Sequence, residues 1–133
     1  MAEEKKQLVD WSSYTVLIAE DDPANYKLLE SLLKKTNINI IHAESGIEAV
    51  NICDAYKEID IVLMDIQLPE LDGFEAAQRI KVKKPDIPVI ILTASVFNGE
   101  TVKPKYTCYN GFISKPFNLN HLIETVSSFL SDS

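Results

Sequence analysis

The sequence lacks any apolar run long enough to cross a bilayer, and its N-terminus lacks the apolar core of a signal peptide. It has two cysteines, Cys53 and Cys108, which are too few for a disulfide framework and are expected to be free thiols in a reducing compartment. Basic residues are scarce: 13 Lys and Arg face 20 Asp and Glu, and the net charge of -7 disfavours non-specific binding to nucleic acid or anionic membranes. These absences predict a cytoplasmic protein that neither inserts into a membrane nor binds nucleic acid directly.

The rest of the composition is that of one folded domain. With 133 residues, of which 46% are hydrophobic, the chain can bury a core. Residues 1–13 are mostly polar and are predicted to be a leader or linker, which leaves residues 14–133 for the domain. Trp11 in this leader either packs against the domain or marks the junction with an upstream domain.

Five short apolar or β-branched runs alternate with helical patterns, at residues 15–19, 38–42, 61–65, 89–93 and 111–114. The second run is the least apolar and is expected near an edge of the sheet. Residues 94–110 are the least regular part, because Gly99 and Pro104 weaken the helix that the alternation predicts there. Strands that alternate with helices imply an α/β fold, a doubly wound five-stranded parallel sheet flanked by helices.

The helices can be assigned by their starts and inner faces. Ser45 and Glu48 have the spacing of a capping box at the start of the second helix. Asn118 or Asn120 can cap the last helix. The residues expected on the inner faces are Leu28, Leu29, Leu32 and Leu33, then Ile47, Val50 and Cys53, then Phe74, Ala77 and Ile80, and in the last helix Leu119, Leu122, Ile123, Val126, Phe129 and Leu130.

The strands end on residues that carry chemistry, namely Glu20-Asp21-Asp22, Asp65, Thr93 and Ser114-Lys115. Ligands bind beyond the carboxyl ends of parallel strands, so these residues are expected to share one rim. Clustered carboxylates repel unless a cation neutralises them, and Mg²⁺ accepts one or two carboxylates while it keeps several waters. Thr93 and Lys115 suit phosphoryl oxygens, and Asp65 is a possible nucleophile because carboxylates form acyl phosphates.

The order and spacing of these motifs resemble the receiver domain of two-component response regulators and hybrid sensor histidine kinases. The motifs lie within residues 15–130 and are Glu20-Asp21-Asp22-Pro23, Met64-Asp65-Ile66-Gln67-Leu68-Pro69, Asp72-Gly73, Thr93-Ala94 and Lys115-Pro116. The resemblance implies a flavodoxin-like sheet with strand order 2-1-3-4-5. It also implies a phosphoacceptor switch in a phosphorelay, which is not an enzyme beyond catalysing its own phosphorylation and slow dephosphorylation.

The resemblance further implies how the acidic residues work. Asp65 would accept a phosphoryl group from a histidine kinase or a histidine phosphotransfer domain. Mg²⁺ would be held by Asp21, Asp65 and the backbone carbonyl of Gln67, and Glu20 would help through a water molecule. Gln67 would also orient the water that hydrolyses the phosphoryl group, which would give moderate autodephosphorylation.

Other residues would transmit the phosphorylated state. Thr93 and Lys115 would bind phosphoryl oxygens, and Phe112 would stand at an aromatic switch position that turns inward when Thr93 moves. Phe112 has no hydroxyl, so a hydrogen bond cannot hold its inward position. The output surface would be the fourth helix, fifth strand and fifth helix, through which a homodimer is possible. The leader and residues 20–25 are more typical of receivers from hybrid kinases than of stand-alone regulators.

Each of these residues also has a simpler interpretation. Taken alone, Asp65 could end a strand by capping the next turn, Lys115 could be a surface lysine, and Phe112 could be an ordinary core residue. His42 and His121 are interpreted as ordinary surface or half-buried histidines, because neither is expected on the rim beside a base. Only the combination of rim residues favours the functional interpretation.

Three other functions fit the sequence less well. A hydrolase that forms an aspartyl phosphate would need a second carboxylate two residues past Asp65, where Gln67 stands. A flavodoxin-like cofactor binder would need donors after the first strand, where the carboxylates of residues 20–22 repel phosphate. A receiver-like interaction domain that is never phosphorylated is the remaining alternative, although the complete set of acids, Thr93 and Lys115 argues against it.

Overall fold

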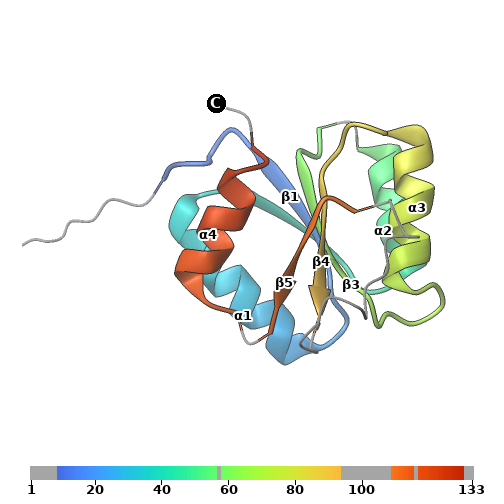
Figure 1. Ribbon diagram of the computed structural model, residues 1–133, viewed down its shortest axis with the longest axis horizontal. Coiled ribbons are helices and arrows are strands. Elements are labelled where there is room, and N and C mark those ends of the chain that lie inside the picture. The colour runs from blue at the N-terminus through green and yellow to red at the C-terminus, as the bar shows by residue number, and fades with distance from the viewer. Residues whose placement is uncertain (1–8, 57, 94–108, 116, 131–133) are drawn as a thin grey trace, which may run out of the picture.

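Five parallel strands form one sheet in the order β2-β1-β3-β4-β5, which confirms the predicted fold class and strand order (Figure 1). The computed structural model describes residues 9–56, 58–93, 109–115 and 117–130. The strands are β1 (Thr15–Ala19), β2 (Asn39–Ala43), β3 (Ile61–Asp65), β4 (Val89–Thr93) and β5 (Gly111–Ser114). Residues 94–108, which hold most of the segment where a helix was predicted, lie outside the described residues, as does Pro116.

Burial separates the central strands from the edges of the sheet. Every residue of β3 and of β4 is buried, as a continuous apolar run in a parallel sheet requires. The strand β2 lies at an edge, as predicted, and buries only its last residue, Ala43. It begins one residue later than predicted because Asn37, with φ of 67°, turns the chain just before it.

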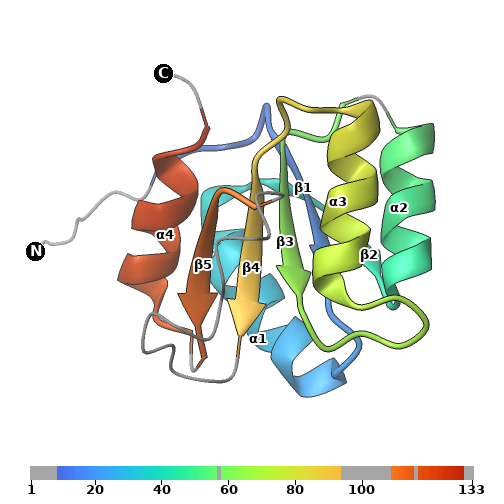
Figure 2. The ribbon, with the colours of Figure 1, turned by 45° about the vertical axis from the view of Figure 1, so that its right-hand side comes forward.

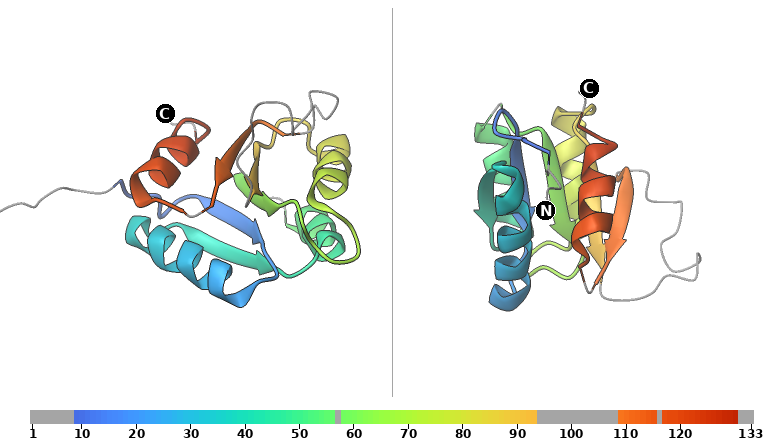
Figure 3. Two further views of the ribbon diagram at one scale, coloured as in Figure 1. Left: turned by 60° about the horizontal axis from the view of Figure 1, so that its bottom comes forward. Right: turned by 90° about the vertical axis from the view of Figure 1, so that its left-hand side faces the viewer.

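Helices cover both faces of this sheet (Figures 1 and 3). One face carries α1 (Pro23–Leu33), the short 3₁₀ turn η2 (Lys34–Thr36) and α4 (Leu119–Ser127), the last helix of the chain. The other face carries α2 (Gly46–Ala55) and α3 (Gly73–Lys83). None of the helices in the described part of the chain is long and apolar enough to cross a membrane.

Alternate strand residues point to opposite faces, so each face of the sheet has its own core. In β1, Leu17 packs on the side of α2 and α3, whereas Val16 and Ile18 pack on the side of α1 and α4. In β3, Val62 and Met64 take the first side, and Ile61 and Leu63 take the second. Asp65 follows in this alternation at the end of β3, where the apolar run stops.

Side-chain caps begin three helices, and those at Ser45 and Asn118 were predicted from the sequence. The Ser45 hydroxyl accepts from the Glu48 backbone N–H at 3.0 Å. The carboxylate of Glu48 turns back and accepts from the Glu44 N–H at 2.7 Å, one residue before the usual position of a capping box. Asp72 and Asn118 cap α3 and α4 in the same manner, each by accepting from the N–H three residues on.

Two predicted inner-face residues are on the outside. Ile47 is 42% exposed, because the face of α2 that meets α3 is made by Gly46, Ala49 and Cys53. Leu28 is 39% exposed, while its neighbour Leu29 is fully buried. Both errors come from extending an apolar stripe by one residue, which rotates the predicted inner face by about 100°.

Trp11 packs against the domain, which was one of the two possibilities left open by the sequence. Its side chain is 5% exposed within the core of α1 and α4. Its backbone N–H donates to the Thr36 carbonyl at 2.7 Å, so the segment before β1 is tied to the end of η2. A large aromatic side chain buried this far stabilises the attachment of the segment that carries it.

Candidate functional site

The carboxyl ends of the parallel strands meet at one edge of the sheet, the edge to which the arrowheads of β3, β4 and β5 point in Figure 2. The register aligns them: Ala19 pairs with Met64, and Thr93 pairs with Ser114. The residues that end or follow β1, β3, β4 and β5 are therefore neighbours on one rim, as predicted from the sequence.

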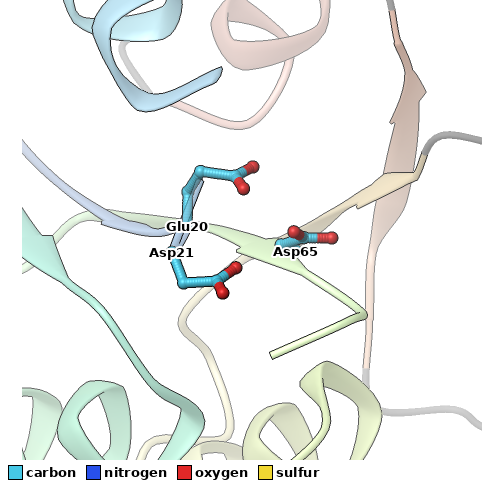
Figure 4. Close-up of side chains that lie close together, drawn as sticks. All are labelled: Glu20, Asp21 and Asp65. Carbon is cyan, nitrogen blue, oxygen red and sulfur yellow. The ribbon is translucent and has the colours of Figure 1, made fainter. Parts of the chain in front are cut away.

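Three carboxylates come together on this rim (Figure 4). Glu20 and Asp21 follow β1, Asp65 ends β3, and one oxygen of each lies within 4.8 Å of the others. Glu20 and Asp65 are buried, at 1% and 5% exposure, whereas Asp21 is exposed. The cluster is thus closed on the protein side and open to solvent on the side of Asp21.

Lys115 lies between the two buried carboxylates. Its Nζ is 3.4 Å from Glu20 Oε1 and 3.6 Å from Asp65 Oδ2, and its side chain is 16% exposed. Its backbone N–H donates to the Thr93 carbonyl at 2.8 Å, so the end of β4 holds the start of the loop that carries the ammonium. Thr93 itself is buried, at 1% exposure. The backbone of Lys115 is therefore hydrogen-bonded to the end of β4 at the rim.

One ammonium leaves the carboxylate charge only partly neutralised. Burial and the neighbouring Asp65 raise the pKa of Glu20 from 4.5 to about 7, against the opposing effects of Lys115 and of the Asp22 backbone N–H. Glu20 Oε1 is buried and accepts no hydrogen bond from the residues that the structure describes. A buried carboxylate oxygen with spare lone pairs, beside two further carboxylates, fits a hard divalent cation that prefers oxygen ligands. The residues present therefore fit Mg²⁺.

The raised pKa of Glu20 predicts a pH dependence of folding without divalent cations. The folded state binds the Glu20 proton more tightly than the unfolded state does. Protonation of Glu20 therefore stabilises the folded state fully below pH 4.5, and this contribution is lost as the pH rises through about 7. We expect the free energy of unfolding of the native protein, relative to that of Glu20→Gln, to fall by about 3 kcal/mol over this interval. Urea unfolding of both proteins at pH 4.5, 6 and 7.5 measures it, and parallel pH profiles would contradict it.

Gln67 and Phe112, which the sequence analysis also singled out, both have exposed side chains. The Gln67 backbone N–H donates to Asp65 Oδ1 at 3.2 Å, while the Gln67 side chain is exposed. Phe112 lies in β5 beside Ile91, but its side chain is 45% exposed. The interpretation of Phe112 as an ordinary core residue is wrong, because Ile113 rather than Phe112 is the residue of β5 that faces the core.

His42 makes a contact with the backbone of Glu20 that the sequence analysis missed. It is half-buried, as expected, but its Nε2 lies 2.8 Å from the Glu20 carbonyl oxygen and its ring stacks on Tyr26. The only signal for it in the sequence is its place one residue before the end of β2, next to the strand that carries the acids. His121, by contrast, is exposed on α4.

A groove of about 290 Å³ between the C-terminal halves of α2 and α3 is separate from this rim. Val50, Cys53 and Ile80 contribute to its apolar lining, and its charged lining includes Arg79 and Lys83. Burial raises the pKa of the Cys53 thiol to about 11, so this cysteine is a poor nucleophile at neutral pH. The residues that can take part in a reaction come together in the carboxylate cluster and not in the groove.

Comparisons with known proteins agree with this geometry. The family model of the response regulator receiver domain matches residues 16–127 of the chain. The polar-differentiation response regulator DivK of Brucella ovis is 35% identical over 121 residues, which are 90% of this chain and 98% of DivK. Among similar solved structures is the receiver domain of a sensor histidine kinase from Pseudomonas aeruginosa PAO1, which has a magnesium ion coordinated in its active-site cleft. The TM-score is 0.79 at 28% identity, and the match covers 87% of this chain and 96% of the kinase receiver chain.

A second similar structure contains a partner protein. It is the receiver domain of the Saccharomyces cerevisiae response regulator Ssk1, co-crystallised with the histidine phosphotransfer protein Ypd1. The TM-score is 0.79 at 30% identity, over 93% of this chain and 91% of the other. The similarity therefore extends over nearly the whole of both chains.

Proposed function

Because this chain belongs to the response regulator receiver domain family of two-component signalling, we propose that Asp65 accepts a phosphoryl group from a phosphohistidine donor. The observation that supports this most directly is the position of Asp65 at the end of β3, with its carboxylate among those of Glu20 and Asp21 and its Oδ2 3.6 Å from Lys115. No carboxylate stands two residues past Asp65, where Gln67 lies, so the chain is a phosphoacceptor switch rather than a phosphohydrolase.

The transfer exchanges one bond to phosphorus for another. An Asp65 carboxylate oxygen attacks the phosphorus, the phosphorus–nitrogen bond of the donor breaks, and the leaving imidazole keeps the electron pair. The Gln67 N–H, 3.2 Å from Asp65 Oδ1, orients the carboxylate, and the Lys115 ammonium and the Thr93 hydroxyl stabilise negative charge on the transferred oxygens. These groups act by positioning and by electrostatics, which phosphoryl transfer mainly requires.

A divalent cation belongs to this proposal. Asp21, Asp65 and the backbone carbonyl of Gln67 would hold Mg²⁺, and Glu20 would act through a water molecule. When bound, Mg²⁺ supplies positive charge that offsets both the carboxylates and the incoming phosphoryl oxygens. The buried Glu20 Oε1, which accepts no hydrogen bond within the described residues and lies 3.4 Å from the Lys115 ammonium, is the feature of this chain that supports such a cation.

The phosphorylated state would be transmitted from Thr93 to Phe112 and to the surface that includes β5 and α4. Phe112 starts from an exposed position, at 45% exposure, and would turn inward when Thr93 moves toward the phosphoryl group. Histidine kinases and histidine phosphotransfer domains are the proposed donors, and the co-crystal of a similar receiver domain with such a phosphotransfer protein supports the second. We also propose a cytoplasmic location, a domain of residues 14–133 after the leader, and an output surface that can form a homodimer.

Intact mass spectrometry tests the proposal directly. The protein is incubated with acetyl phosphate, with and without Mg²⁺, and weighed. One phosphate adduct is expected with Mg²⁺, and a rate at least about 10-fold lower is expected after chelation. No adduct with acetyl phosphate or with a phosphorylated phosphotransfer domain would favour the alternative, an interaction domain that works without phosphorylation.

Replacing Gln67 with alanine is expected to lengthen the lifetime of the phosphorylated protein. The exposed amide of Gln67 can orient the hydrolytic water, so its loss should slow dephosphorylation by about 3- to 10-fold. The loss of inorganic phosphate from the labelled protein measures this rate. Gln78→Ala, an exposed glutamine on α3, is the matched control, and equal rates for the two variants would disprove the role of Gln67.

A further inference from the structure

The peptide that joins the consecutive acids Glu20 and Asp21 follows the end of β1. Figure 4 shows the two side chains leaving the chain on opposite sides, and one oxygen of each carboxylate lies within 4.8 Å of the other. The last ladder bond of β1 is donated by the Glu20 N–H to the Ala43 carbonyl at 3.1 Å, and the Glu20 carbonyl lies just beyond it.

His42 holds that carbonyl. Its Nε2 is 2.8 Å from the Glu20 oxygen, and because a carbonyl can only accept, the proton of this hydrogen bond is on Nε2. A hydrogen bond to the carbonyl fixes the plane of the Glu20–Asp21 peptide. The plane of this peptide sets the directions in which both acids leave the chain, and therefore whether their carboxylates meet.

Tyr26 holds the other side of the same histidine. The two rings are stacked, with centroids 3.6 Å apart and planes 10° apart. Tyr26 is in the first turn of α1, where its backbone N–H donates to the Asp22 carbonyl at 2.9 Å. His42 thus contacts both ends of the acidic loop of residues 20–22: the start through Glu20, and the end through the helix that the loop enters.

His42 is itself rigidly placed, because it lies within β2 and pairs with Ile18 of β1. We propose that His42 and Tyr26 are positioning residues that hold Glu20 and Asp21 in the arrangement that binds the cation. This inference rests on the proposed function, in which these acids serve Mg²⁺-dependent phosphorylation of Asp65. Groups that orient the ligands of a metal typically change its affinity by about 10- to 100-fold.

The test compares variants that separate the hydrogen bond from the stacked ring. His42→Ala removes both, His42→Phe keeps a ring without the donor, and His42→Gln keeps a planar donor at a similar reach. Tyr26→Leu removes the stacked partner, and His121→Ala, at an exposed position on α4, is the matched control. The dissociation constant of Mg²⁺ is measured for the unphosphorylated proteins by NMR titration of backbone amides, together with the free energy of unfolding.

We expect His42→Ala and His42→Phe to weaken Mg²⁺ binding by about 10-fold, and Tyr26→Leu by about 3-fold. His42→Gln is expected to remain within about 3-fold of the native protein, and His121→Ala to match it. At saturating Mg²⁺, the phosphorylation rate of His42→Gln should approach the native rate. Rescue by the conservative donor is the result that a purely structural role for the ring would not produce.

Equal Mg²⁺ affinity in the native protein, His42→Phe and His42→Gln would overturn the inference. So would equal weakening in both variants, or a loss of affinity that simply follows the loss of unfolding free energy. If His42→Ala does not fold, the comparison of His42→Phe with His42→Gln decides the result.

A native protein that binds Mg²⁺ but forms no adduct at Asp65 would refute the proposed function alone, because the affinities still test the positioning role. A native protein that binds no Mg²⁺ would refute both.

Discussion

Asp65→Asn is expected to abolish the phosphate adduct that acetyl phosphate and Mg²⁺ produce on the native protein. The amide oxygen of asparagine is neutral and a much weaker nucleophile than a carboxylate, so the rate should fall by at least about 100-fold. The side chains have the same shape, and the change removes one of two neighbouring buried charges. The fold should therefore persist, with an unfolding free energy at least equal to that of the native protein.

Intact mass and urea unfolding of Asp65→Asn measure the two expectations together. The matched control is Asp54→Asn, an exposed carboxylate on α2 whose only described partner is Lys83, at 3.0 Å. This control should form the adduct at the native rate. An adduct that persists at the native rate on Asp65→Asn would place the acceptor elsewhere, and fragmentation of the labelled protein would then locate it.

Gly73→Ala is expected to cause a large loss of stability at the rim. A Cβ on Gly73 would lie 2.2 Å from the Asp65 carbonyl oxygen and 2.7 Å from the Ile66 Cα. Both are backbone atoms, so no side chain can rotate to relieve the contact, and the start of α3 must separate from the end of β3. We expect a loss of about 3 kcal/mol in the free energy of unfolding, near the upper end of the usual cost of overpacking.

The same change should also impair phosphorylation, because the clash is with the backbone of Asp65 itself. Gly111→Ala is the matched control, since its Cβ would meet its nearest atom, Phe129 Cε2, at an ordinary contact distance of 3.5 Å. Urea unfolding of both variants should show less than about 1 kcal/mol of loss for Gly111→Ala. Equal losses in the two variants would show that the contact between Gly73 and Asp65 does not constrain the rim.

The elements of this fold were predictable where the signal is local. Ile61 to Met64 form a continuous apolar run, and only a strand buried on both faces of a sheet suits such a run in an alternating α/β pattern. Asp72 and Asn118 cap the next N–H groups within three residues, so their helix starts depend on little beyond the nearby sequence. The rim followed from a topological rule, because parallel strands bring their carboxyl ends to one edge whatever their exact register.

Features that depend on contacts between distant segments were less accessible. The exposure of Ile47 depends on how α2 rotates against α3, and the sequence periodicity fixes that rotation only to within about one residue. The burial of Trp11 depends on a space beside η2 and α4 that no local pattern describes. The weak pattern of residues 94–110 leaves their helix a prediction.

By itself, the sequence determined the parallel sheet and the set of acids, hydroxyl and ammonium at its edge. Both depend on short-range hydrophobic patterns and on the order of the strands. Only the tertiary structure decided how these groups are held. Glu20 is buried and Asp21 is exposed, and the carbonyl of the peptide between them is bonded by His42 from the neighbouring strand. The orientation of that peptide depends on a hydrogen bond that spans 22 residues, and the periodicity of either strand carries no information about it.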